Sequence, residues 1–211
     1  ATVQNNSQSQ EDNMKISNSG EGLLSILGKV LNIGKGNTVI DNTNTASGVA
    51  VAGNIENASG NVSLKNEGNQ GSTISGKVKN SQGSTTVTNN GGKLLVSQTG
   101  SVTNDENDIT VINNGVGGTD IIGTITNAGE NIGITNEAGK LLISGKVENT
   151  GKDIVVTNTG DGGAEISGSA TNSGSNSIIA ITNTKGALDI TKTATVQNNS
   201  QSQEDNMKIS N

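Results

Sequence analysis

The chain has 211 residues, a formal net charge of −6, 30 glycines and 32 asparagines, and it contains no Cys, Pro, His, Trp, Tyr, Phe or Arg. Without His or Cys it cannot form a Cys/His zinc site or a Ser-His-Asp triad, and without aromatic residues or Arg it lacks the groups that usually stack on bases and bind phosphates. No run approaches the 18 apolar residues of a membrane-spanning helix, so we expect no nucleic-acid partner and no membrane span.

The first 18 residues of the chain recur at its end. Residues 1–18 and 194–211 are identical, at an offset of 193 residues. We therefore divide the chain into one repeat unit, residues 1–193, and the start of the next identical unit, residues 194–211. Either such units follow one another in a tandem array, or the chain has been extended into the next copy.

A shorter repeat lies within the unit, beginning with an aliphatic residue, any residue and then Asn. Its occurrences are 22 to 27 residues apart, and the eight steps sum to 193, so one unit contains eight subrepeats. The occurrences begin at Val3, Val30, Ile55, Val78, Val102, Ile125, Val147, Ala170 and Val196.

Two further apolar runs follow in each subrepeat. The second alternates and ends in Asn, as in residues 62–66, 109–113, 132–136, 154–158 and 179–183; the third ends mostly in Gly, as in residues 24–28, 49–53 and 141–145. Alternating Val, Ile and Leu favour β-strands over disorder. Three short strands per subrepeat predict an all-β fold, a right-handed parallel β-helix (β-solenoid) of about eight coils per 193-residue unit.

The spacing also predicts the packing of the coils. Strands stacked about 4.8 Å apart give a unit roughly 38 Å long, with roughly six aliphatic side chains per coil pointing inward. We expect a thinner core at Ala164 and Gly133. Asn and Gly suit the corners because they tolerate a positive φ, and stacked Asn side chains can form amide ladders along the axis.

The Asn that ends the second run forms the most regular polar column. It could be an exposed recognition ladder, but turn geometry with amide stacking is the favoured interpretation. The column comprises Asn18, Asn42, Asn66, Asn89, Asn113, Asn136, Asn158 and Asn183.

Threonine is frequent in the first run, and a flat array of Thr could order water as an ice-binding face. Thr103, Thr126 and Thr171 are expected to point outward there. The other members of the column disrupt such an array, which favours an ordinary solvated face. They are Gln4, Leu31, Glu56, Lys79 and Glu148.

Acidic residues are the remaining catalytic or metal-binding candidates, but they share no subrepeat position. Paired carboxylates can cleave glycosides, yet no aromatic residue is present to hold a sugar. The regular Gly-Gly-x-Gly-x-Asp of calcium-binding repeats is also absent. We therefore expect solvated turns, no enzyme activity, no metal and no cofactor. These candidates are Glu11, Asp12, Asp105, Glu106, Asp108 and Asp161.

The lysines near the corners are expected to discourage unwanted strand pairing and not to bind a ligand. They are Lys29, Lys77, Lys146, Lys152 and Lys192.

Two phrases resemble a known type of repeat. Residues 136–145, NEAGKLLISG, and residues 88–96, TNNGGKLLV, are similar to filamentous-haemagglutinin-type repeats of large secreted bacterial adhesins. The resemblance implies a β-helical shaft that is exported unfolded and folds outside the cell. The longer subrepeats and the near-identical large repeat depart from the usual pattern.

These features lead us to expect a structural repeat of a long extracellular β-solenoid fibre that provides reach, stiffness and contact at a bacterial surface. The alternative is an adhesin shaft whose outward faces bind glycan or protein ligands directly. A polysaccharide-cleaving β-helix is disfavoured. Expected partners are further copies of the repeat, in tandem or end to end, with lateral bundling as an additional contact.

Overall fold

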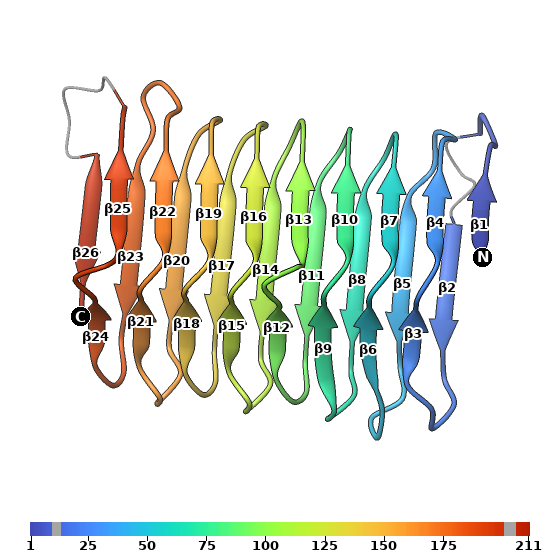
Figure 1. Ribbon diagram of the computed structural model, residues 1–211, viewed down its shortest axis with the longest axis horizontal. Helices are drawn as coiled ribbons and strands as arrows, with labels where there is room; N and C mark the ends of the chain where they lie inside the picture. Colours follow the sequence, from blue (N-terminus) through green and yellow to red (C-terminus); the bar gives the residue numbers. More distant parts are fainter. Residues whose placement is uncertain (10–13, 201–205) are drawn as a thin grey trace.

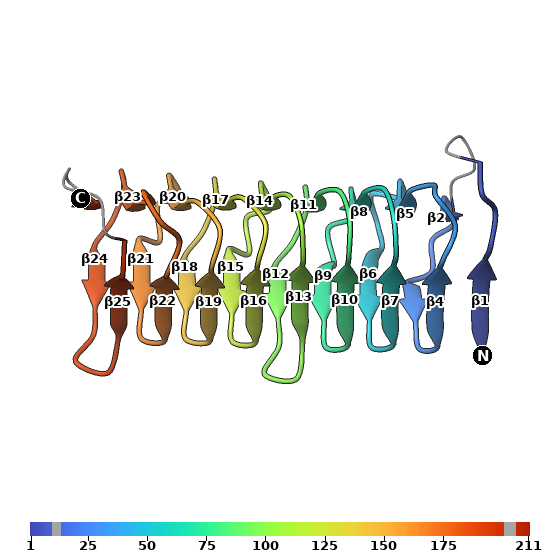
Figure 2. The same ribbon diagram turned by 90° about the horizontal axis from the view of Figure 1, so that it is seen from above.

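The structure is a computed structural model that describes residues 1–9, 14–200 and 206–211. Its described residues form 26 strands in three parallel sheets and no helix. The chain coils from one end of an elongated stack to the other, and each coil contributes one strand to each sheet (Figures 1 and 2). The predicted fold class, an all-β solenoid of about eight three-stranded coils, is confirmed.

The first sheet contains the strands of the aliphatic-x-Asn run. Every step in the register pairs the residues expected from the sequence, from Val3 with Val30 to Ala170 with Val196. Its nine strands are β1 (Thr2–Asn5), β4 (Lys29–Asn32), β7 (Asn54–Asn57), β10 (Lys77–Asn80), β13 (Ser101–Asn104), β16 (Thr124–Asn127), β19 (Lys146–Asn149), β22 (Ser169–Asn172) and β25 (Thr195–Asn198).

The second sheet contains the alternating run that ends in Asn. Three residues of each interior strand point inward and two point outward. Its nine strands are β2 (Met14–Asn18), β5 (Thr38–Asn42), β8 (Val62–Asn66), β11 (Thr85–Asn89), β14 (Ile109–Asn113), β17 (Ile132–Asn136), β20 (Ile154–Asn158), β23 (Ile179–Asn183) and β26 (Met207–Ser210).

The third sheet has eight strands, one fewer than the others. It completes each coil before the chain turns into the first sheet again. Its strands are β3 (Leu24–Ile26), β6 (Gly48–Val51), β9 (Gly71–Ile74), β12 (Leu94–Val96), β15 (Thr119–Ile121), β18 (Leu141–Ile143), β21 (Ala164–Ile166) and β24 (Leu188–Ile190).

The core is a continuous aliphatic column between the three sheets. In the coil of β16, β17 and β18 the buried aliphatic residues are Ile125, Ile132, Ile134, Leu141 and Ile143. That is five aliphatic side chains, against the roughly six expected, because further inward positions are occupied by Asn. The interior therefore combines hydrocarbon with regularly spaced amides.

Two expectations about Gly and Asn were wrong. Gly133 was expected inward, but it lies on the outer side of β17, where an added Cβ would meet no atom within 4 Å; Ala164 does point inward. The corner Asn residues do not use a positive φ either. Among the described non-glycine residues, only Asn176 has one.

The Gly residues after the third strand have another physical reason. Each lies against the backbone of the preceding coil, so that a Cβ on Gly76 would lie 1.9 Å from the Gly53 oxygen, and one on Gly168 would lie 2.1 Å from the Gly145 oxygen. Neither Gly76 nor Gly168 has a positive φ. Close approach of stacked backbones, and not a left-handed turn, therefore favours Gly at Gly76 and Gly168.

Candidate functional site

The predicted Asn column forms one uninterrupted chain of side-chain hydrogen bonds along the axis. In each step the Nδ2 of one Asn donates to the Oδ1 of its equivalent in the next coil, at 2.6 to 3.0 Å. The chain links Asn18, Asn42, Asn66, Asn89, Asn113, Asn136, Asn158, Asn183 and Asn211.

The same amides also close the turn that follows each strand. Asn113 donates to the Gly115 carbonyl at 3.1 Å and accepts from the Gly115 N–H at 3.3 Å. Asn42 through Asn183 are 0 to 2% exposed, whereas Asn18 is partly exposed and Asn211 is exposed at the two ends of the chain of amides. Buried amides with satisfied partners hold the coils together, and they cannot serve as an exposed recognition ladder.

A second, shorter ladder links the Asn residues that end the first four strands of the first sheet. Asn5, Asn32, Asn57 and Asn80 are linked in the same way, at 2.7 to 2.9 Å. From Asn80 onward, each Asn of this column instead donates from Nδ2 to a backbone carbonyl in the turn that follows it; Asn80, for example, donates to the Ser84 carbonyl. The aliphatic-x-Asn repeat is the sequence signal for this column, but the sequence prediction used it to place a strand and count subrepeats and gave its Asn no separate role.

Buried hydroxyls of the third sheet donate to the Asn ladder of the second sheet. Thr119 Oγ1 donates to Asn136 Oδ1 at 2.8 Å, and Ser72 Oγ donates to Asn89 Oδ1 at 2.9 Å. In both pairs the donor lies in the coil before the Asn. These bonds allow polar residues to occupy inward positions of the third sheet without leaving an unpaired group.

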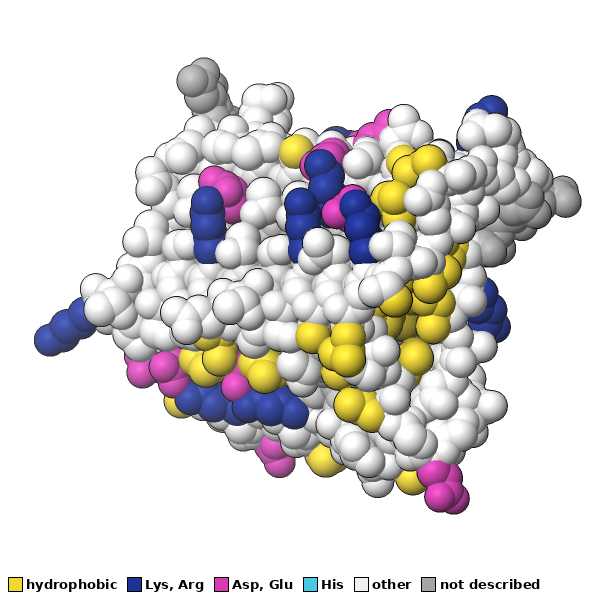
Figure 3. Space-filling model, turned by 45° about the vertical axis from the view of Figure 1, so that its right-hand side comes forward, with side chains coloured by type: hydrophobic (Ala, Val, Ile, Leu, Met, Phe, Trp, Pro, Cys, Tyr) yellow, Lys and Arg dark blue, Asp and Glu magenta, His cyan; other side chains and the backbone are white. Residues whose placement is uncertain are grey.

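Charged side chains are confined to the outside, where they pair between or within coils. Lys29 Nζ lies 2.8 Å from Glu56 Oε2, and Lys146 Nζ lies 2.6 Å from Glu148 Oε2. Figure 3 shows lysines beside acidic side chains on the flank of the stack. Of the other corner lysines, Lys152 pairs with Glu130, whereas Lys77 and Lys192 are exposed.

One surface pair shifts the ionisation of its members. Lys65 Nζ lies 2.6 Å from Glu67 Oε1, and Asn90 Nδ2 donates to Glu67 Oε2 at 3.0 Å. The hydrogen bond from Lys65, followed by that from Asn90, lowers the pKa of the Glu67 carboxyl. The same contact with Glu67 raises the pKa of the Lys65 ammonium.

The acidic candidates do not converge. Asp105 pairs with Lys79 at 3.0 Å, Glu106 accepts from the Gly83 N–H, and Asp108 accepts from Asn131. Glu11 and Asp12 lie outside the described residues. Within the part of the chain that is described, no group of three acidic residues could hold a metal ion.

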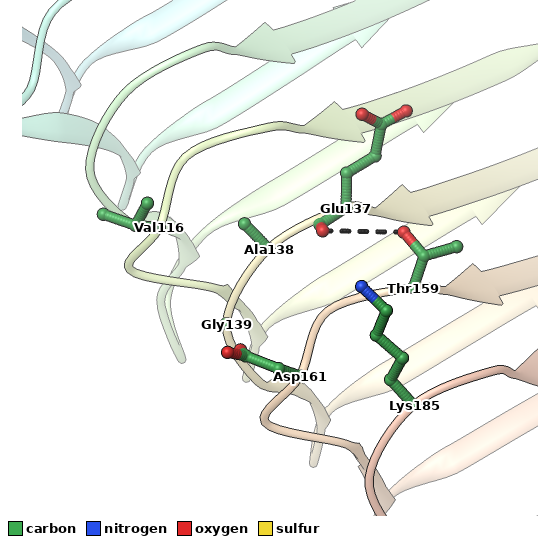
Figure 4. A pocket seen from close by; sticks show the side chains of 7 residues that line it. All are labelled: Val116, Glu137, Ala138, Gly139, Thr159, Asp161 and Lys185. Carbon is green, nitrogen blue, oxygen red and sulfur yellow. Dashed lines mark hydrogen bonds between the residues drawn. The ribbon is translucent and has the colours of Figure 1, made fainter.

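Asp161 lines a shallow hollow of about 300 Å³ at the corner between the second and third sheets. Glu137, Thr159 and Lys185 line it as well, and Val116 projects beside it with 84% of its surface exposed. Figure 4 shows these side chains rising from successive turns, with Thr159 donating to the Glu137 carbonyl. The hollow is open, and it presents the carboxylates of Glu137 and Asp161 and the ammonium of Lys185 to a ligand.

The outer face of the second sheet differs from the other surfaces because it is uncharged over five successive strands, β11, β14, β17, β20 and β23. Its side chains project from a parallel sheet, and Thr88, Thr135, Thr157 and Thr182 lie in one column with Ile112. This uncharged face consists of Thr86, Thr88, Thr110, Ile112, Gly133, Thr135, Val155, Thr157, Ala180 and Thr182.

Outward Thr residues also occur on the first sheet, where the sequence analysis placed them. Thr103, Thr126 and Thr171 lie on its outer side, where Glu56 and Lys79 precede Thr103 in the column and Glu148 separates Thr126 from Thr171. The mixed column supports an ordinary solvated face there.

Compared with protein-family models, curated proteins and solved structures, the chain matches none of them. No helix in the described ranges has the length and apolarity to cross a membrane. The geometry must therefore support any functional conclusion by itself.

Proposed function

We propose that this chain is a structural repeat of a long extracellular β-solenoid fibre at a bacterial surface, where it provides reach, stiffness and contact. The observation that carries the proposal is the continuity of the stack across the 193-residue period. β25 and β26 belong to the second copy of the 18-residue segment, yet they pair with β22 and β23 as interior strands do.

The two ends of the period are interchangeable in register. Val196, the counterpart of Val3, pairs with Ala170 of the preceding coil, and Val3 itself pairs with Val30 of the following coil. Asn211, the counterpart of Asn18, accepts a hydrogen bond from Asn183, as each interior Asn accepts one from the Asn of the preceding coil. A further copy can thus continue all backbone ladders and the amide chain without a cap. Such uncapped continuation is what an extended solenoid needs.

The proposal is tested by measuring length against copy number. Chains with one, two and four covalently linked 193-residue units are imaged by electron microscopy. Because eight coils rise about 4.8 Å each, the contour should grow by roughly 38 Å per added unit at constant width. Compact particles whose width grows with copy number would contradict a fibre.

The filamentous-haemagglutinin-type resemblance supports the finer proposal of a secreted adhesin shaft, because its phrases fall in the Asn-turn-third-strand segments of the coils, including β12 and β18. Direct ligand binding by outward faces is the second candidate. It is favoured by the open hollow at Asp161 and Lys185. A glycan array probed with the chain and with the double variant D161N/K185M tests it; equal retention of both proteins would contradict binding at the hollow.

A further inference from the structure

The uncharged face of the second sheet lies in the middle of the stack and is available to another molecule. Figure 2 shows the second sheet along one side of the stack, away from the corner that joins the third sheet to the first. In the same coils the first sheet presents Lys79 and Glu148 outward, and the third sheet presents Asp120 and Glu165. Covering the uncharged face therefore avoids the cost of removing a charge from water, which covering either of the other faces would incur.

The charge of the chain favours a second copy as the molecule that covers this face. The net charge is −6, so two copies repel each other wherever charged surfaces meet. At the uncharged face no charge lies in the middle of the contact, and the charged residues are in the turns at either end of the strands. An uncharged centre with a charged rim is the usual anatomy of a protein interface.

The two rims of the face differ in charge. The turns that enter β14, β17, β20 and β23 carry five acidic residues and one lysine, a sum of −4. The turns that leave these strands carry two acidic residues and two lysines, a sum of zero. The entering turns are residues 105–108, 128–131, 150–153 and 173–178, and the leaving turns are residues 114–118, 137–140, 159–163 and 184–187.

This difference selects the relative direction of two copies that face each other. With parallel stack axes, the acidic rim of each copy lies beside the neutral rim of the other. With antiparallel axes, the two acidic rims lie together. Packed sheets are about 10 Å apart, a distance at which like charges still repel at physiological salt. Charge therefore favours parallel axes.

Side-chain size favours the same direction. With parallel axes each strand faces its own equivalent running the opposite way, so that its second residue faces the fourth residue of the partner strand. Thr135 then faces Gly133, and Thr182 faces Ala180. Antiparallel axes centred on β17 would set Gly133 against Gly133 and leave a void between the sheets. Filled contacts stabilise an interface, whereas a void forfeits them.

We propose that two copies of this chain pair laterally through the uncharged face, with parallel axes and β17 facing β17. Five strands spaced by about 4.8 Å, each of five residues rising about 3.3 Å, give a footprint of roughly 400 Å² per copy. A stable interface typically buries about 800 Å² per partner. A single unit therefore pairs weakly, and every linked unit adds another footprint to the same pair.

Sedimentation equilibrium of the 211-residue chain tests which face is used. Thr157 lies on the uncharged face, Thr171 lies on the outer side of the first sheet, and both are half-buried. The wild-type chain should dimerise at concentrations up to about 1 mM. T157K should weaken the dimer by at least about tenfold, because it buries an unpaired ammonium. T171K changes the net charge equally and should stay within about twofold of wild type.

Three results would overturn the lateral pair: a wild-type chain that remains monomeric up to that concentration, a T157K chain that dimerises as wild type does, or a T171K chain that is weakened as much as T157K. Circular dichroism during thermal unfolding checks that the variants keep the native β-structure. T110K, on β14 of the same face, replaces T157K if that variant unfolds.

Cross-linking tests the direction of the pair, because the described residues include no cysteine. Asn107 and Val116 are exposed in the turns that enter and leave β14. A thiol cross-linker about 10 Å long, the separation of packed sheets, is added to an equal mixture of N107C and V116C chains. Mass spectrometry should find mainly pairs that join one variant to the other. An excess of N107C joined to N107C would overturn the parallel arrangement.

The lateral pair rests on the proposed fibre only for its strengthening with length. In electron micrographs the linked units should lengthen equally in wild type and in T157K, and T157K should give the single, unpaired width. Units that lengthen while dimerisation is insensitive to T157K would remove the lateral pair alone. T157K-sensitive dimers of the 211-residue chain, with linked units that fail to lengthen, would remove the fibre alone.

Discussion

At the scale of single residues, the buried amides contribute specificity that an aliphatic core would lack. Asn113 uses both of its amide hydrogens and both sides of its carbonyl oxygen, with Asn89, Asn136 and Gly115 as partners. A strand that slipped by two residues along its neighbour would place Asn113 against an aliphatic residue such as Ile134 and leave those groups unpaired in the interior. The amide chain therefore penalises register errors that interchangeable Val and Ile side chains would tolerate.

Removing one amide from the ladder should be costly. We expect Asn113→Ala to lower the free energy of unfolding by about 3 kcal/mol, because the groups bonded to Asn113 lose partners inside the core. The neighbouring Asn114 is exposed, and Asn114→Ala should cost less than about 0.5 kcal/mol. Urea unfolding of both variants checks the difference, and a cost for Asn113→Ala as small as that expected for Asn114→Ala would show that this amide adds no stability.

The Lys65–Glu67 pair predicts a small pH effect with a definite sign. Because the pKa of Glu67 is lowered in the folded state, its contribution is present above the unfolded pKa and disappears as the pH falls through the folded pKa. Exposed pairs contribute little, so the pKa is the better readout. In Lys65→Met the pKa of Glu67, followed by NMR titration of its carboxyl carbon, should rise toward its ordinary value. An unchanged pKa would assign the shift to Asn90 alone.

At the scale of the element, the close stacking of successive coils limits the size of the residue at the corner after a third-sheet strand. A methyl group on Gly76 would overlap the backbone of the preceding coil at 1.9 Å from the Gly53 oxygen. We expect Gly76→Ala to destabilise by about 3 kcal/mol through displaced backbone. Thermal unfolding measures the effect.

The control for this substitution lies on the outer face of β17. Gly133→Ala meets no atom within 4 Å, and it should stabilise by about 0.5 to 1 kcal/mol because it lowers the entropy of the unfolded chain. If Gly133→Ala were as harmful as Gly76→Ala, a general intolerance of Ala in place of Gly, and not contact with the preceding coil, would be the cause.

Strand positions and register were readable from the sequence because one aliphatic-x-Asn phrase marks each coil. The period brings Val78 beside Val102 and Val147 beside Ala170, as the structure has them. Side-chain partners were less accessible. Two examples are the hydrogen bond from the Thr119 hydroxyl to the Asn136 amide oxygen and the close approach of Gly76 to the Gly53 backbone. Both depend on which corners of successive coils touch, and the spacing of residues along one coil does not reveal which corners these are.

At the scale of the whole molecule, the stack is held almost entirely by contacts between neighbouring coils. Strand pairing, the amide chain and most ion pairs link one coil to the next. In such a one-dimensional system the stability of a coil depends on having neighbours on both sides. The exposure of Val3 and Ile209 at the ends, against 0% for Val102 in the middle, shows where neighbours are missing.

Hydrogen exchange should follow this gradient. In the 211-residue chain, amides of β13 to β17 should exchange most slowly, and those of β1, β2, β25 and β26 fastest, because terminal coils can open without disturbing the rest. Exchange measured by mass spectrometry on proteolytic fragments resolves the coils. Uniform protection from end to end would indicate that the stack opens only as a whole.

A chain with two linked units sharpens the test, because fragments from its two copies are chemically identical. Residues 179–193 then occur once at the joint, stacked on both sides, and once near the free end. We expect their isotope envelope to split into a slow and a fast population, whereas fragments covering residues 109–136 should remain a single slow population in both chains. The one-unit chain, which should give a single fast envelope for residues 179–193, controls for slow correlated opening. A single fast envelope in the two-unit chain would mean that the second unit does not dock on the first, and would contradict the continuity on which the fibre depends.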